Sequence, residues 1–155
     1  MNSPEQIAIE TPSDEAGYEV DFVLWSERQA QLLRDRNFHD IDLDNLIEEL
    51  DAMGRSERRE LRSRLTVLLM HLLKCSYQPL RKSASWIGTL GEQRHQIDLL
   101  LEQNPSLRNE VPLYMDHSYA VARHRAALET KLPLSSFPDT NPFSMEQIFK
   151  LDYLP

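Results

Sequence analysis

Glu92 and His95 have the Glu-x-x-His spacing that helical bundles use to bind pairs of iron ions. Residues three apart lie on one face of a helix, so both side chains can reach the same ion. Such bundles repeat the motif on a second helix and add a glutamate from each of two others. This chain has the motif once, with Glu48 or Glu49 to supply a further carboxylate. A surface pair is the better interpretation, and we expect no metal and no other cofactor.

His71 and Cys75 lie one helical turn apart, near the edge of a predicted apolar stripe. This spacing can hold a metal ion or form a nucleophilic Cys–His pair. No third residue to orient the histidine is evident, and a buried thiol beside a hydrogen-bonded core histidine is commoner. Cys75 is the only cysteine, so an intramolecular disulfide is impossible. The chain lacks phosphate-loop, GxGxxG, Ser–His–Asp and zinc-finger patterns, which favours a protein that is not an enzyme.

Charged residues gather on one side of the segment 43–77 when it is drawn as a helix. An acidic block comes first and a basic block follows, about 110° around the helix from the apolar stripe. The residues of this charged face that we predict to contact a partner are Glu48, Asp51, Arg55, Arg58, Arg59 and Arg62. Three interpretations are open: a solvated surface, a partner-binding surface, and a phosphate-binding row of arginines. Because the acid-then-base order is self-complementary between antiparallel helices, a two-fold dimer is one form of the second interpretation.

Two smaller groups of basic residues have weaker patterns. Arg81 and Lys82 follow the predicted end of the long helix and can bind a phosphate or a carboxylate. His117 and His124 share a face of the predicted fourth helix, and we interpret them as solvated. No aromatic residue interleaves the arginines of the charged face, as base stacking requires, and the formal net charge is −8. We therefore expect a protein partner or a second copy of the chain rather than nucleic acid.

A long helix must position most of these residues. Its apolar stripe keeps helical phase through Leu43, Ile47, Leu50, Gly54, Leu61, Leu65, Leu68 and Leu72. The helix is predicted to end at about Tyr77, where Gln78 precedes Pro79. Two interpretations compete at Gly54: a break with Ser56 capping a new helix, and a continuous or mildly kinked helix. The unshifted apolar phase favours continuity.

Four further helices are predicted. They are 21–36, a segment capped by Ser83 or Ser85, a segment from Pro105 that Pro112 kinks or delays, and 145–150 behind a capping box at Ser144. The predicted fold is all-α: a bundle of about four main helices, with an irregular C-terminal arm and a short terminal helix. The predicted core contains Trp25, Leu50, Leu61, Leu65, Leu68, Leu72, Trp86, Ile97 and Val121, and Leu128 is predicted on the core side of the fourth helix.

Length and composition set the domain organisation. A chain of 155 residues favours one compact domain, here residues 18–155, after a flexible acidic tail over residues 1–17. No secretory leader and no apolar run of membrane-spanning length is evident, so we expect a cytoplasmic protein without membrane contact.

Several runs of residues are specific enough to suggest a family. They are NLIEEL at 45–50, MGRSERR at 53–59, HLLK at 71–74, EQR at 92–94 and MEQI at 145–148. They closely resemble domain-of-unknown-function family 29 of bacteria and cyanobacteria, over about residues 18–155. The resemblance implies an all-helical fold and no activity, so no catalytic residue can be carried over. Our first hypothesis is a non-enzymatic interaction module that uses the charged face; the alternatives are a metal-dependent bundle enzyme and a nucleic-acid or phosphate binder.

Overall fold

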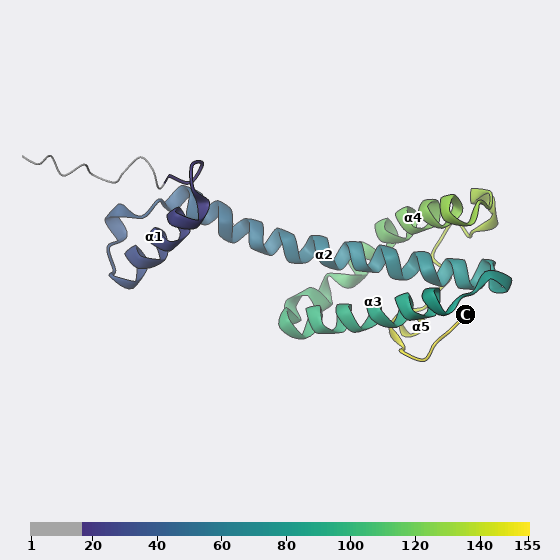
Figure 1. The fold of residues 1–155 in the computed structure, drawn as a ribbon. Helices are drawn as coiled ribbons and strands as arrows, with labels where there is room; N and C mark the ends of the chain where they lie inside the picture. Colours follow the sequence, from purple (N-terminus) through teal and green to yellow (C-terminus); the bar gives the residue numbers. More distant parts are fainter. Residues whose placement is uncertain (1–16) are drawn as a thin grey trace, which may run out of the picture. The chain divides into compact units, whose positions relative to one another are not determined.

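The structure is a computed structural model that describes residues 17–155. Every regular element among these residues is helical, which confirms the predicted all-α fold (Figure 1). The α-helices are α1 (Phe22–Arg34), α2 (Leu43–Tyr77), α3 (Ala84–Gln103), α4 (Val111–Thr130) and α5 (Met145–Phe149). The 3-10 turns are Phe38–Asp40, Pro79–Arg81, Pro105–Asn109 and Leu134–Ser136. The predicted acidic tail lies outside the described residues, except for Gly17.

α2 runs without interruption for 35 residues, which confirms the continuous helix through Gly54. No glycine in the described chain has a positive φ. A Cβ placed on Gly54 would come within 3.4 Å of the flexible guanidinium of Arg58. Neither the backbone nor the packing therefore requires a glycine here. The helix ends at Tyr77, as predicted from Pro79.

Contacts divide the chain into two compact units, residues 1–53 and residues 54–155. The N-terminal unit contains α1 and the first turns of α2, and the C-terminal unit contains the remainder. That residues 18–155 form a single domain stays a prediction. Among the described residues, no helix combines the length and the apolar composition that crossing a bilayer would require.

Polar contacts hold the N-terminal unit together. Asp42, directly before α2, accepts hydrogen bonds at Oδ2 from Trp25 Nε1 at 3.0 Å and from Asn45 Nδ2 at 2.8 Å. Its backbone N–H donates to Gln29 Oε1 at 2.9 Å. Trp25 and Gln29 are the only buried residues among residues 17–53. This unit therefore has almost no apolar core of its own.

The prediction that Leu50 belongs to the core is wrong, because this side chain is 61% exposed. Other positions make the contacts in this unit: Trp25 of α1 donates to Asp42, directly before α2, and the Tyr18 hydroxyl donates to Glu49 of α2 at 2.5 Å. Glu49 lies one residue before Leu50, about 100° around the helix, so the apolar stripe faces away from these contacts.

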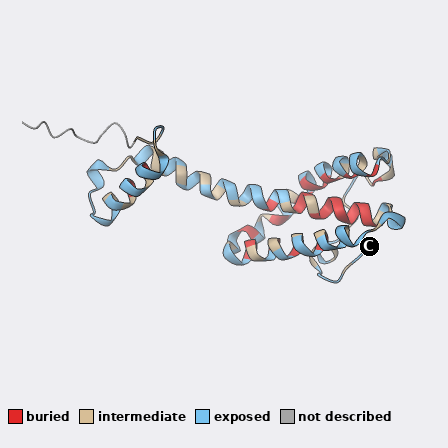
Figure 2. Cartoon of the chain, in the orientation of Figure 1, coloured by how far each residue is buried: buried red, intermediate tan, exposed pale blue. Residues whose placement is uncertain are grey.

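The C-terminal unit is built around the second half of α2. Its predicted leucine stripe is fully buried, with 0% exposure at Leu61, Leu65, Leu68 and Leu72. Figure 2 shows these buried turns of α2 where α3 and α4 lie along it. Other helices of this unit add the buried residues Leu90, Ile97, Met115, Tyr119, Ala126 and Ile148. Trp86, also predicted to be core, is only half-buried.

α4 begins later than the sequence suggested. Pro105–Asn109 forms a 3-10 turn, and Pro112 lies in the first turn of α4, so the delayed start is confirmed. Val121 is 36% exposed and Leu128 is 79% exposed, so both core predictions are wrong. Val121 and Leu128 follow Tyr114 at steps of seven, and at 100° per residue this stripe lies roughly 100° or more around α4 from the middle of its buried side. The side of α4 that is buried instead carries Val111, Met115, Ser118, Tyr119, Ala122, Ala126 and Thr130.

The C-terminal arm is fastened to the helices by two arginines, Arg94 and Arg123. Arg94, 3% exposed, donates from Nε to the Ile148 carbonyl at 2.8 Å. Its other N–H groups donate to the carbonyls of Gln147, Leu151 and Tyr153. Carbonyls at the end of a helix have no partner within the helix, so the guanidinium satisfies the last turn of α5. Arg123 donates to the Phe137 carbonyl at 3.1 Å in the same manner.

The predicted start of the terminal helix is confirmed. Ser144 and Gln147 form the reciprocal hydrogen bonds of a capping box, and α5 ends at Phe149. Ser83, one of the two predicted caps, accepts a hydrogen bond from the Trp86 N–H at the start of α3.

Candidate functional site

Two arginines of the charged face make contacts within the C-terminal unit. Arg58 Nε donates to both carboxylate oxygens of Glu110, at 3.2 and 3.0 Å. The hydroxyl of Tyr114 also donates to Glu110. The hydrogen bond from Tyr114 first, and then those from Arg58, hold the pKa of Glu110 below its usual value. The guanidinium carbon of Arg62 lies 5.3 Å from the centre of the Tyr114 ring, in a cation–π contact.

Arg59 and Arg62 also line a hollow between α2 and α4, which we call the basic groove. Its volume is about 340 Å³. The groove is lined by Arg59, Arg62, Ser63, Thr66, His117, Val121 and Arg125. No acidic side chain is among these lining residues. Among the described residues, Arg59 and Arg125 have no ion-pair partner, whereas Arg64 pairs with Glu60.

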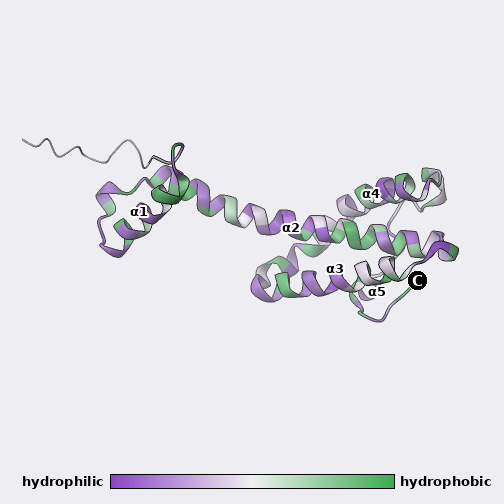
Figure 3. Cartoon of the chain, viewed as in Figure 1, coloured by the Kyte–Doolittle hydropathy of each residue, from purple (hydrophilic) through white to green (hydrophobic). Residues whose placement is uncertain are grey.

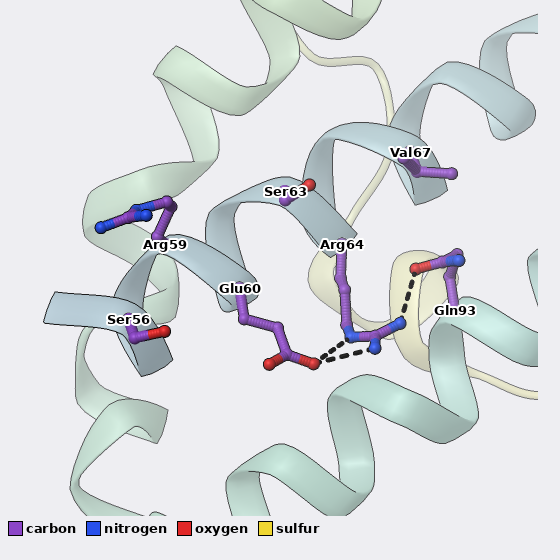
Figure 4. Close-up of a pocket in the computed structure, with 7 residues that line it drawn as sticks. All are labelled: Ser56, Arg59, Glu60, Ser63, Arg64, Val67 and Gln93. Carbon is purple, nitrogen blue, oxygen red and sulfur yellow. Dashed lines mark hydrogen bonds and ion pairs between the residues drawn. The ribbon is translucent and has the colours of Figure 1, made fainter. Parts of the chain in front are cut away.

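A second hollow, of about 440 Å³, lies on the neighbouring side of α2 (Figure 4). There Arg64 is held by Glu60 at 2.8 Å and donates to Gln93 Oε1 at 3.4 Å. Figure 4 shows the Arg59 side chain pointing away from this pair. Arg64 is therefore neutralised by Glu60 of its own helix, whereas Arg59 lines both this hollow and the basic groove without an ion-pair partner among the described residues.

The acidic half of the charged face falls in the N-terminal unit. Glu48 and Asp51 are exposed on α2, and Arg55, the first arginine of the basic block, is also exposed. Glu48 and Arg55 each make an interaction within the chain. The residues of the predicted charged face therefore differ in environment: some interact with other residues of the chain, whereas Arg59 is exposed and has no ion-pair partner among the described residues.

The metal candidates do not converge. Glu92 accepts a hydrogen bond from Gln96 at 2.9 Å, one turn along α3. His95 lies on the surface, in the lining of a hollow with Arg94 and Arg108. Within residues 17–155, no three His, Cys, Asp or Glu side chains are grouped as metal binding would require. The proposed role of Glu92 and His95 as ligands therefore gains no support from the geometry.

His71 and Cys75 are part of the core. His71 Nδ1 lies 2.9 Å from the carbonyl of Val67, one turn earlier. Burial lowers the pKa of His71 and raises the pKa of the Cys75 thiol. A thiol with a raised pKa is a poor nucleophile, because the thiolate is the reactive form. This geometry is that of a structural histidine and a buried thiol.

Arg81 and Lys82 do not act together. Lys82 donates from Nζ to the carbonyl of Pro155, the last residue of the chain. Arg81 is exposed and lies beside Tyr77 and Gln78 in the lining of a shallow hollow. Lys82 therefore holds the C-terminal arm, which leaves Arg81 as a single exposed cation.

Sequence reasoning missed Arg125 as a groove residue and interpreted His117 as solvated. Both are exposed, but they lie eight residues apart on α4 and line the same hollow as Arg59. Positions eight apart share a helical face, which was a usable signal. Which side of α2 faces these two residues could not be predicted from the sequence, because it depends on how α4 packs against α2. Sequence reasoning also missed Lys74, which is buried, pairs with Glu129 at 2.5 Å and lies 4.4 Å from the Trp86 ring centre.

The chain folds into an all-α protein with a basic groove on its surface. The family described as "Domain of unknown function DUF29" matches residues 18–154, and the chain belongs to that family, as the resemblance implied. No curated protein and no solved structure matches the chain.

Proposed function

We propose that the protein is a non-enzymatic interaction module that binds an acidic segment of another protein, or of a second copy, through the basic groove. The observation that carries the proposal is the lining of that groove. Arg59 on α2 and Arg125 on α4 line the hollow from two different helices, His117 precedes Arg125 by eight residues on α4, and no carboxylate lines the hollow. A bacterial, cytoplasmic setting is part of the same proposal.

Several arginines of the C-terminal unit outside the groove have partners within the chain. Arg58, Arg64 and Arg123 each have a carboxylate partner within the chain. Arg94 is surrounded by carbonyl oxygens of the C-terminal arm. In a chain with eight more acidic than basic residues, unneutralised arginines gathered on one surface favour an external anion.

Carboxylates are the better partner than nucleic acid. Arginine binds both carboxylates and phosphates in bidentate geometry. The groove has no aromatic side chain in its lining on which a base would stack. The net charge of −8 opposes approach to a nucleic acid. An acidic protein segment can bind such a groove without base stacking and without a net positive charge on the whole protein.

The experiment is a tagged purification from the native host at low salt, with and without nuclease, read by mass spectrometry. We expect a stoichiometric protein, or the chain itself as a dimer, to persist after nuclease treatment. The double reversal Arg59→Glu with Arg125→Glu should remove it. These two positions are better choices than Arg58 and Arg62, because those residues contact Glu110 and Tyr114 and their loss would disturb the fold.

The matched control is Arg81→Glu with Arg108→Glu, which changes the net charge equally at exposed arginines outside the groove. Circular dichroism should show unchanged helicity in both variants. A complex that survives reversal of the groove, or that disappears with nuclease, would overturn the proposal.

A further inference from the structure

The N-terminal unit exposes an unusual amount of apolar surface. Of the nineteen large apolar side chains that are exposed in the described chain, ten lie within residues 17–53. They are Val20, Phe22, Val23, Leu24, Leu33, Phe38, Leu43, Ile47, Leu50 and Met53. Trp25 is the one apolar residue of this stretch that is buried. Figure 3 shows hydrophobic residues on α1 and the first turns of α2, where Figure 2 shows exposed surface.

Three of these residues continue the core stripe of α2. Leu43, Ile47 and Leu50 are 60%, 49% and 61% exposed, in the same helical phase as the fully buried leucines of the second half. Their spacing of four and three residues is that of the a and d positions of a helix–helix seam. Because burying apolar side chains is favourable, an uncovered apolar stripe of this kind favours a partner.

Acidic residues flank this apolar stripe. Asp44, Glu48 and Asp51 lie on one side of it, on the charged face, and all three are exposed. Residues 17–53 contain ten aspartates and glutamates against three arginines and no lysine. Residues 54–155 contain eleven acidic and fourteen basic residues, so the acidic character belongs to the N-terminal unit.

We infer that the N-terminal unit docks an amphipathic helix of a partner protein whose apolar side is flanked by lysine or arginine. The apolar stripe of Leu43, Ile47 and Leu50 receives the apolar side, and the exposed Asp44 and Asp51 attract the basic flank. This surface is separate from the basic groove and goes beyond the function proposed for it.

Charge argues against a second copy as the occupant. If two α2 helices met antiparallel along this stripe, Ile47 of one would pack beside Leu50 of the other, as the four-three spacing requires. The acidic residues 44–51 of the two copies would then lie side by side. Like charges in such flanking positions oppose pairing, and a basic partner removes that repulsion.

The test uses the full chain and a synthetic probe helix of three heptads, with leucine at a and d and lysine at the flanking positions. Lysine repulsion keeps this peptide monomeric. One control peptide replaces the flanking lysines by glutamate, and the other replaces the leucines by serine. Binding is measured by fluorescence anisotropy and the mass of the protein by sedimentation velocity.

We expect the leucine–lysine peptide to bind one protein chain, and each control peptide to bind at least about tenfold more weakly. The double variant Ile47→Glu with Leu50→Glu should weaken binding by at least about tenfold. Its matched control, Leu113→Glu with Leu128→Glu, adds the same charge at apolar residues of α4 that are 75% and 79% exposed, and should bind normally.

The inference is overturned by no binding of the leucine–lysine peptide, by equal binding of either control peptide, or by binding that the substitutions at Ile47 and Leu50 leave unchanged. A protein dimer that these substitutions dissociate also overturns it, because a second copy would then cover the stripe. Reversal of Arg59 and Arg125 should leave peptide binding unchanged. If the leucine–lysine peptide does not bind but the protein forms a complex that depends on Arg59 and Arg125, this inference is wrong and the proposed function is supported.

Discussion

Arg58 and Glu110 are joined by two hydrogen bonds, at 3.2 and 3.0 Å, although they lie 52 residues apart in the sequence. Arg58 belongs to the exposed side of α2, and Glu110 immediately precedes α4. This pair turns part of a predicted partner-binding face into an internal contact that orients the start of α4. Arg58 therefore supports the C-terminal unit, whereas the neighbouring Arg59 is exposed to solvent.

Replacing Glu110 by glutamine should remove a pH-dependent part of the stability. The pKa of Glu110 lies below its usual value of 4.5 in the fold, because Tyr114 and Arg58 donate hydrogen bonds to the carboxylate. A lowered folded-state pKa contributes stability above pH 4.5 that is lost as the pH falls through the folded-state pKa. Thermal melts at pH 7 should therefore rank the native chain above Glu110→Gln, with the difference shrinking below pH 4.5. A constant difference across this range would contradict the assignment.

Arg94→Met should loosen the C-terminal arm. The guanidinium donates to four carbonyls of the arm, and an unsatisfied buried acceptor costs about 1–3 kcal/mol. Because the arm can detach and rehydrate some of these groups, we expect a loss of about 2–4 kcal/mol in urea unfolding. Hydrogen exchange should speed up over residues 145–155. Arg108→Met, at an exposed arginine, serves as the control and should change neither measurement.

His71 should make the fold less stable as the pH falls below 6.5. Burial lowers its pKa in the folded state, so the unfolded chain binds a proton that the folded chain does not. The contribution is fully present above the unfolded-state value of about 6.5 and declines below it by at most about 1.4 kcal/mol per pH unit. Urea unfolding at pH 7.5 and 5.5, compared with His71→Gln, measures it. An equal decline in both proteins would show that other groups are responsible.

Cys75 should behave as a buried thiol. It is 0% exposed and burial raises its pKa, so in the folded protein its reaction with a thiol reagent at pH 8 should be at least about a hundredfold slower than that of free cysteine. Labelling should become complete in urea. Rapid labelling of the folded protein would restore the possibility of a reactive Cys–His pair with His71.

Two leucines test the corrected core. Leu68→Ala removes a fully buried side chain of α2 and should cost about 2–5 kcal/mol of unfolding free energy. Leu128→Ala changes a side chain on α4 that is 79% exposed and should cost no more than about 0.5 kcal/mol. Urea titration of both variants makes the comparison. Similar losses would mean that α4 packs in the phase predicted from the sequence.

The residues of the candidate surfaces could be predicted from the sequence only in part. The sequence identified Arg59 and Arg62 as members of a stripe on α2, because a single helix defines its own faces. It did not identify Arg125 as their neighbour, since that depends on how α4 packs on α2. It did not show that Arg58 is engaged either, because Glu110 approaches from 52 residues away.

The sequence by itself determined the local features of the fold. The uninterrupted phase of the leucines predicted α2 through Gly54, Pro79 ended it, and Ser144 with Gln147 marked the last helix, since these signals act within a few residues. Only the tertiary structure decided which apolar residues are covered. Leu68 and Leu50 occupy equivalent positions on one helical stripe, yet one is fully buried and the other is 61% exposed. Periodicity defines a face, and burial requires a neighbouring element to pack against it; α3 and α4 do so for Leu68.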